Sequence, residues 1–170
     1  MLGPLFIKLG VKKAGEIGLN ITEEDLIETY HVGKVMDKQA PVIPAGASLA
    51  EIIKIISDTD NFYYPVVDNG GKLIGAITWS NIRSTFARQE LSSWLVALDI
   101  MEPVIDKVTP EAALSESLQL AKKLDIDYLP VVASKNNNKF VGILDCRAVH
   151  RQLSAEVLAR QQKADMAAGG

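Results

Sequence analysis

Residues 62–78 read FYYPVVDNGGKLIGAIT, and residues 127–145 read DYLPVVASKNNNKFVGILD. Each stretch is an apolar, partly β-branched run, then a polar turn, then a second apolar run. This pattern is typical of two antiparallel strands joined by a hairpin turn. The chain is therefore predicted to contain the same hairpin twice.

The two hairpins belong to a longer internal repeat. An offset of 65 aligns Met36 with Met101 and Pro65 with Pro130, and the offset becomes 67 at Gly75 and Gly142. The change falls inside the second hairpin's turn, where an exposed loop tolerates an insertion. A repeat at a fixed offset indicates two copies of one structural unit.

The regions around the hairpins predict the other elements of each unit. Ser48 precedes an apolar helical pattern and has Glu51 three residues later, which is the spacing of a capping box. In the second copy Ala113 occupies the cap position and has no side-chain acceptor. The expected elements are a lead-in helix near 22–30, a strand near 42–43, helices from Ser48 and over 79–89, a strand over 104–108, and helices over 114–124 and 146–163.

These elements give each copy the order β-α-β-β-α and an α+β fold. A unit of about 60 residues buries too little surface to be stable alone, so the two copies are expected to pack on each other. The predicted boundaries are a leader over 1–29, a first unit over 30–92, a second over 93–163, and a frayed tail over 164–170.

Composition excludes several classes of function. The net charge is −3 with no basic stripe, which argues against nucleic acid as a partner. The only cysteine is Cys146, so no internal disulfide can form. No apolar run approaches the ~20 residues of a membrane span, and the first residues do not follow the order of a signal peptide. We expect a cytoplasmic location, or the cytosolic face of a membrane protein.

No set of residues suggests catalysis. His31 and His150 lie far apart, outside any metal-ligand spacing, and no nucleophile, base and acid occur together. Cys146 is interpreted as a packed thiol, His150 as a solvent-facing residue and His31 as a linker residue. We expect no catalytic residue, no metal site and no enzyme activity.

The doubled pattern resembles a tandem pair of CBS domains, also called a Bateman module, over about residues 30–155. The resemblance rests on a Met before the first strand, on Pro-Val-Val in the second strand, and on a Gly in the third strand that is followed at once by a helix. It implies two units packed through their sheets about a pseudo-two-fold axis, with two clefts between them. In many members these clefts bind AMP, ADP, ATP or S-adenosylmethionine.

The family's binding pattern after the third strand is Gly-x-x-Thr/Ser-x-x-Asp/Asn. Thr78 and Asn81 match it, and the resemblance implies contacts to phosphate and to the ribose hydroxyls, respectively. A hydroxyl just before a helix is also a reasonable anion site on physical grounds. The alternative is that Thr78 only caps the helix and Asn81 only fills its first turn. The adenine side of this cleft would come from the other unit, from Thr109, Ile126, Asp127 and Tyr128.

The second cleft departs from the pattern. Asp145 is a good helix cap, but it places an anion where phosphate would lie, and Ala148 offers no group to a ribose. Arg147 is a candidate to compensate for the charge of Asp145. This cleft would draw on Pro44, Asn61, Phe62 and Tyr63 from the first unit. We therefore expect one ligand per chain, in the cleft of Thr78 and Asn81.

The predicted function is regulation by an adenine nucleotide, with AMP, ADP or ATP as the expected ligand and no required cofactor. Residues 90–101 are similar to the junction in CBS pairs of chloride-channel-type transporters, which favours a channel or transporter as the regulated partner. A regulatory domain of an enzyme and a ligand-free dimerisation module remain alternatives. A homodimer is expected, because each unit has a pair of amphipathic helices that need cover.

Overall fold

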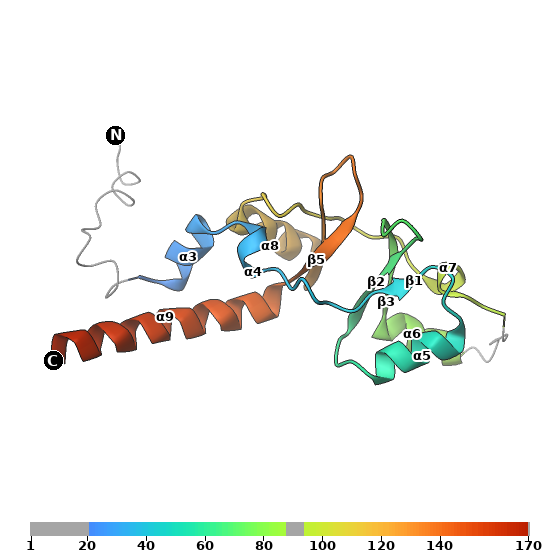
Figure 1. Ribbon diagram of the computed structural model, residues 1–170, viewed down its shortest axis with the longest axis horizontal. Coiled ribbons are helices and arrows are strands. Elements are labelled where there is room, and N and C mark those ends of the chain that lie inside the picture. Colours follow the sequence, from blue (N-terminus) through green and yellow to red (C-terminus); the bar gives the residue numbers. More distant parts are fainter. Residues whose placement is uncertain (1–20, 88–93, 170) are drawn as a thin grey trace.

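The computed structural model describes residues 21–87 and 94–169, which form two units side by side (Figure 1). The first unit contains β1 Ile43–Pro44, α5 Leu49–Ser57, β2 Tyr63–Val67, β3 Leu73–Thr78 and α6 Trp79–Ala87. The second contains α8 Leu114–Leu124, β4 Tyr128–Val132, β5 Phe140–Asp145 and α9 Cys146–Gly169. Helices α3 Glu23–Thr29 and α4 Val32–Val35 precede the first unit in the chain, and helix α7 Ala97–Ile100 lies between the two units in sequence. The predicted α+β class is confirmed.

Both predicted hairpins form. Strand β2 pairs antiparallel with β3, β4 pairs antiparallel with β5, and β1 runs parallel to β2. The strand expected over 104–108 is wrong in extent, since only Val108 pairs, with Val131. The reason is that Glu102 pairs with Ala76 of the first unit, so the residues between Glu102 and Val108 cross from one unit to the other.

The helix ends follow the capping chemistry of the sequence. The Thr22 and Ser48 side chains each close a capping box, with Asp25 and Glu51, respectively. Ala113 makes no side-chain cap for α8, as expected. Helix α9 continues to Gly169, so the tail predicted to fray after Lys163 is helical in the structure. Its last turns are rich in Ala and contain Met, which favour helix, and no Pro interrupts them.

The lead-in segments, helices α4 and α7, each pack on the other unit rather than on the one that follows them in sequence. The Val32 and Gly33 amides of α4 donate to the Ala112 and Pro110 carbonyls of the second unit, both at 2.9 Å. At the other end, the Ala97 amide of α7 donates to the Ala47 carbonyl of the first unit at 2.9 Å. Val32 and Val35 accordingly lie in the second unit's core, while Ala97 lies in the first unit's core. The sequence boundary between the units is therefore not the boundary of packing.

Two glycines allow the segment after each lead-in helix to lie directly on a strand. A Cβ on Gly75 would lie 2.5 Å from the Met101 Sδ and 2.9 Å from the Glu102 carbonyl oxygen. A Cβ on Gly142 would lie 2.8 Å from the Asp37 carbonyl oxygen. Both distances are too short for a real Cβ contact, which explains why each third strand carries Gly at this point.

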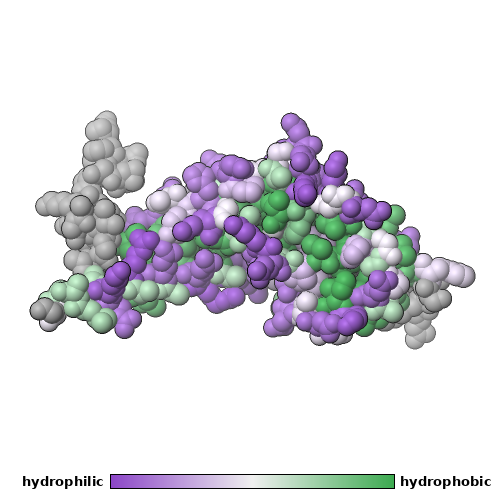
Figure 2. All heavy atoms as spheres, viewed as in Figure 1, coloured by the Kyte–Doolittle hydropathy of each residue, from purple (hydrophilic) through white to green (hydrophobic). Residues whose placement is uncertain are grey.

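The two hairpins are joined where their turns meet. The Leu73 amide donates to the Asn138 carbonyl at 2.8 Å, and the Phe140 amide donates to the Gly71 carbonyl at 3.0 Å. Helix α9 extends from the second unit away from the first (Figure 1). Hydrophobic side chains gather on the visible face of the first unit, whereas hydrophilic side chains are common over α8 and α9 (Figure 2). Among residues 21–87 and 94–169, no helix combines the length and apolar character needed to cross a membrane.

Candidate binding cavity between the units

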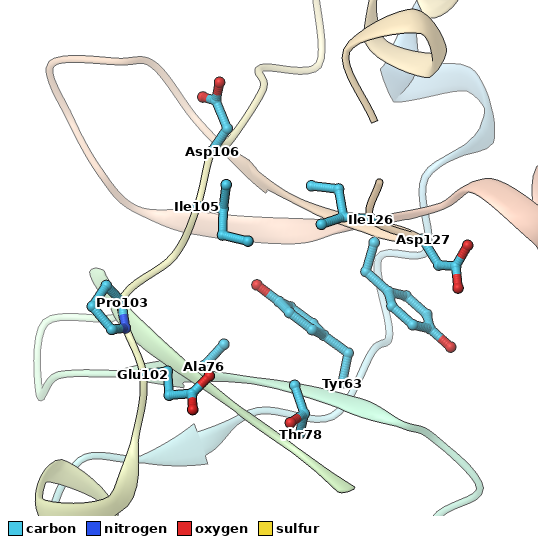
Figure 3. Close-up of a pocket in the computed structure, with 10 residues that line it drawn as sticks. Tyr63, Ala76, Thr78, Glu102, Pro103, Ile105, Asp106, Ile126 and Asp127 are labelled. Carbon is cyan, nitrogen blue, oxygen red and sulfur yellow. The ribbon is translucent and has the colours of Figure 1, made fainter. Parts of the chain in front are cut away.

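A cavity of about 230 Å³ opens between the two units. Strands β2 and β3 supply one wall, the crossing segment before Val108 a second, and the start of β4 a third (Figure 3). Its lining is a mixture of aromatic, aliphatic and acidic side chains with one hydroxyl: Tyr63, Ala76, Thr78, Glu102, Pro103, Ile105, Asp106, Ile126, Asp127 and Tyr128.

Four of the six residues predicted to bind a ligand line this cavity. They are Thr78 from the first unit and Ile126, Asp127 and Tyr128 from the second. Asn81 instead lines a neighbouring groove of about 370 Å³, and Glu102 lies between the two because it borders both. Thr109 lies outside the cavity lining; its carbonyl accepts from the Ala112 amide at 3.1 Å.

Thr78 and Asn81 form a capping box at the start of α6. The backbone N–H of Asn81 donates to the Thr78 Oγ1 at 3.2 Å, and the backbone N–H of Thr78 donates to the Asn81 Oδ1 at 3.0 Å. The Thr78 hydroxyl also lies 3.1 Å from that Oδ1. The remaining group of Asn81, its Nδ2, donates to the Glu102 Oε1 at 2.6 Å. The alternative interpretation of this pair, a helix cap, is thus present in the structure, and it also holds a carboxylate in place.

Two tyrosines at equivalent repeat positions meet between the units. Tyr63 pairs with Thr78 across β2 and β3, and Tyr128 pairs with Asp145 across β4 and β5. Their rings stack with centroids 5.4 Å apart and planes 15° apart. Tyr63 therefore lines the cavity of Thr78, whereas the sequence interpretation placed it in the other cleft. The stack brings both tyrosines to the same interface, which repeat position alone did not indicate.

The Tyr63 ring lies in the middle of the cavity (Figure 3). Burial raises the pKa of its phenol to about 12. Within the described part of the chain, no hydrogen-bond partner of the Tyr63 hydroxyl is found. A neutral phenol beside the open cavity can both donate to and accept from a bound molecule.

The charged residues of the cavity are all acidic. Glu102, Asp106 and Asp127 line it, and no Lys, Arg or His does so among the described lining residues. Asp106 lies 3.8 Å from the Lys135 Nζ, and Asp127 lies 3.2 Å from the Arg147 Nη2. Glu102 makes no ion pair among residues 21–87 and 94–169.

The second strand-to-helix junction is occupied by its own cap. The Asp145 Oδ1 accepts from the Arg147 and Ala148 amides, both at 3.1 Å. The guanidinium of Arg147 is directed to Asp127 of the same unit. The expectation that Asp145 caps α9 is confirmed, whereas the low affinity expected of this cleft stays a prediction.

Six lining residues were not in the predicted set: Tyr63, Ala76, Glu102, Pro103, Ile105 and Asp106. For Glu102 a signal was present, because the offset of 65 aligns it with Asp37 and each acid follows an aligned Met. Both acids pair with the third strand of the other unit, at Ala76 and Ile143. The remaining lining residues of the crossing segment carry no such signal, since their role depends on the path between the units.

The residues that were excluded from catalysis have structural contacts. His150 is exposed, but its Nδ1 lies 2.6 Å from the Glu23 Oε1, so it joins α9 to α3 rather than facing solvent alone. Burial raises the pKa of the half-buried Cys146 thiol to about 11. In the described ranges, no group of three or more His, Cys, Asp or Glu side chains is placed to hold a metal ion.

Comparison with known proteins identifies the repeat. The family model for the CBS domain matches residues 32–88 and again residues 96–154. A putative acetoin utilization protein (AcuB) from Vibrio cholerae has 22% sequence identity and a TM-score of 0.67, covering 78% of this chain and 96% of that one. No curated protein matches the chain.

Two further structures with the same fold were solved with ligands. CBSX2 in complex with AMP is 21% identical, and the CBS domain pair of protein MJ0100 in complex with 5'-methylthioadenosine and S-adenosyl-L-methionine is 22% identical. Each has a TM-score of 0.63, covering 74% of this chain and 97% of the other. The chain spans only 62% of an uncharacterized conserved protein from Pyrococcus horikoshii that also has this fold, with 17% identity and a TM-score of 0.62 over 78% of this chain.

Proposed function

Because this chain belongs to the CBS domain family as a tandem pair, we propose that it is a non-catalytic regulatory module that binds an adenosine-containing ligand in the cavity between its two units. The ligand class includes the adenine nucleotides AMP, ADP and ATP. Binding between the units would stabilise one arrangement of the pair over others, which is how a ligand regulates an attached or partner protein.

One observation carries this proposal: the cavity combines flat apolar surfaces with polar groups from both units. Ile105 and Ile126 lie above the Tyr63 ring, and Thr78 lies on the opposite side of it (Figure 3). A heterocyclic base needs apolar or aromatic faces, while its sugar needs hydrogen-bonding groups nearby. The volume of about 230 Å³ is below the ~300 Å³ at which ligand pockets begin, so we expect Tyr63 to shift when a whole nucleoside enters.

The relatives support the ligand class. The AMP of CBSX2 and the 5'-methylthioadenosine and S-adenosyl-L-methionine of protein MJ0100 all contain adenosine. At identities of 21% and 22% these structures share the fold with this chain, and the shared adenosine is the reason to test that group first.

Calorimetry with adenosine, AMP, ADP, ATP and S-adenosylmethionine tests the proposal, with cytidine as the control ligand. We expect one site per chain, and a ligand at 100 times its Kd should stabilise the protein by ~2.7 kcal/mol. Ile105→Ala should weaken binding several-fold without unfolding, because Ile105 is 68% exposed while it lines the cavity. Leu158→Ala is the matched control, since Leu158 is 64% exposed on α9 and outside the lining. Equal loss in both variants, or no binding by any adenosine compound, would refute the proposal.

For the regulated partner we propose a membrane channel or transporter of the chloride-channel type. The similarity of residues 90–101 to the junction in that family supports this context. A CBS domain of a membrane protein from Sphaerobacter thermophilus has the same fold, with 18% identity and a TM-score of 0.62. Fusing residues 1–170 to a reconstituted channel and measuring flux with and without ligand tests this context. Flux that is insensitive to a bound ligand would contradict it.

A homodimer is the third part of the proposal. Ile53 on α5, Phe62 before β2 and Trp79 at the start of α6 are 39%, 56% and 40% exposed, and all three belong to the first unit. Several large apolar side chains exposed on one unit favour association with another protein surface. Light scattering should give twice the chain's mass of 18.5 kDa. A monomer mass at tens of micromolar would contradict it, and a dimer that binds no ligand would support the ligand-free dimerisation module instead.

A further inference from the structure

Glu102 borders the cavity beside Asn81, the residue to which the family pattern assigns contacts to a ribose. Its backbone is fixed by the pair of hydrogen bonds with Ala76, at 2.8 and 2.9 Å. Its carboxylate is fixed by Asn81, whose Nδ2 donates to Oε1 at 2.6 Å. Figure 3 shows this carboxylate on the same side of the Tyr63 ring as Thr78. The side chain of Asn81, meanwhile, uses both its oxygen and its nitrogen within the protein.

The start of α6 has few groups left for a phosphate. The amides of Thr78 and Asn81 donate within the capping box, and the Trp79 amide donates to the Phe62 carbonyl at 3.3 Å. A helix N-terminus binds anions through free N–H groups, so this one is largely satisfied already.

The charge at this position also opposes a phosphate. Among the described residues of the lining there is no cation, and the nearby Lys135 and Arg147 are each paired with another carboxylate. A phosphate beside Thr78 would therefore meet the unpaired negative charge of Glu102 with no compensating cation. Two negative charges in one cavity repel each other, and partial exclusion of water strengthens the repulsion.

We propose that Glu102, oriented by Asn81, accepts hydrogen bonds from the ribose hydroxyls, and that the cavity selects an adenosine compound whose 5' substituent is neutral or positively charged over one carrying phosphate. This inference rests on the proposed function and narrows its ligand class. A carboxylate has two acceptor oxygens, and Asn81 occupies one lone pair of one of them. The remaining capacity fits a vicinal diol, whose two hydroxyls are donors, and a hydrogen bond to an ionised acceptor is stronger than a neutral one.

The first test compares ligands on the unmodified protein by calorimetry. Adenosine should bind at least about tenfold more tightly than AMP, and 2'-deoxyadenosine about tenfold more weakly than adenosine, because one donor to Glu102 is lost. These comparisons need no variant. AMP binding more tightly than adenosine, or equal affinity for adenosine and 2'-deoxyadenosine, would overturn the inference.

The second test is Glu102→Gln, which removes the charge and keeps an oxygen that can accept from Asn81. We expect adenosine to bind several-fold more weakly and AMP about tenfold more tightly, so that the order of the two ligands reverses. A loss of folding would weaken both ligands together and leaves the first test to decide. Changes in the same direction for both ligands in a folded variant would overturn the inference.

Asp37→Asn is the matched control. Asp37 is aligned with Glu102 in the repeat and pairs with Ile143 as Glu102 does with Ala76, but it lies outside the lining of this cavity. The substitution changes the net charge by the same amount, so it measures the long-range electrostatic effect alone. Both affinities should change less than about twofold, because Asp37 is exposed and outside the lining, and salt screens exposed charges. If no adenosine compound binds any of these proteins, the proposed function itself fails, whereas tight AMP binding leaves that function intact and removes only this inference.

Discussion

Replacing Gly75 with alanine tests how closely the units are held together. The added Cβ would lie 2.5 Å from the Met101 Sδ and 2.9 Å from the Glu102 carbonyl oxygen. The thioether can move away because Met has a flexible side chain. The carbonyl can move only if the backbone segment after α7 is displaced from β3, because this oxygen accepts the Ala76 amide at 2.9 Å.

The expected loss of stability follows from those contacts. Displacing the segment breaks the two hydrogen bonds between Ala76 and Glu102, each contributing ~0.5–1.5 kcal/mol. Keeping it in place forces an overpacked contact that costs about 1–3 kcal/mol. Either way, we expect Gly75→Ala to lower the free energy of unfolding by about 1–3 kcal/mol, and the melting temperature by roughly 2–12 °C for a chain of this length.

Urea and thermal unfolding, followed by circular dichroism, measure this loss. Gly46→Ala is the control, because a Cβ there would meet nothing within 4 Å. The control should change stability by less than about 0.5 kcal/mol. Gly142→Ala should behave like Gly75→Ala, since its Cβ would lie 2.8 Å from the Asp37 carbonyl oxygen. If Gly75→Ala were as stable as Gly46→Ala, the close contact would not be a constraint on the fold and this reasoning would be refuted.

Three further predictions concern titratable groups. Burial raises the pKa of Cys146 from 9.0 to about 11, which lowers its thiolate fraction at neutral pH about 100-fold. Because a more basic thiolate is also more nucleophilic, the thiol should react with Ellman's reagent roughly tenfold more slowly than an exposed cysteine, and an immediate reaction would contradict this. The phenol of Tyr63 should ionise near pH 12, so the ultraviolet absorbance titration of the wild type should contain a step near pH 12 that is missing in Tyr63→Phe. If the variant instead lost a step near pH 10, the prediction would be wrong. The hydrogen bond to His150 lowers the pKa of Glu23 below its usual 4.5. The wild type should therefore be more stable than Glu23→Gln above that pH, with the difference shrinking as pH falls through the folded-state pKa; a difference that grew on acidification would refute the assignment.

The sequence contained most of the information about local structure. Hairpins are visible as alternating apolar runs around polar turns, and both form where expected. The capping box of Ser48 depends on two residues three positions apart, so sequence spacing was sufficient to predict it. The end of α9 was predicted too early, because a helix extending beyond its unit shows no apolar face and was interpreted as a frayed tail.

The candidate cavity was only partly predictable. The repeat and the family pattern pointed to Thr78, and to Ile126 and Tyr128 across from it, because these occupy fixed places relative to the strands. Tyr63 was assigned to the opposite cleft, and this assignment was wrong. Tyr63 pairs with Thr78 across the hairpin, which places it on the interface that the two units share. Glu102 lines the cavity and accepts a hydrogen bond from Asn81, which is 21 positions away in the chain. Local sequence spacing does not encode a contact over that separation.

The sequence by itself determined that the chain has two similar units, which elements each contains and in what order. Those features depend on residue periodicity, turn residues and caps, which act over a few positions. Only the tertiary structure decided which unit each lead-in segment joins: α4 packs in the core of the second unit, and α7 in the core of the first. The physical reason is that a short apolar segment can satisfy its backbone and bury its side chains against either of two similar surfaces. The choice depends on the path of the whole chain, and that same exchange carries Glu102 and Ile105 into the cavity between the units.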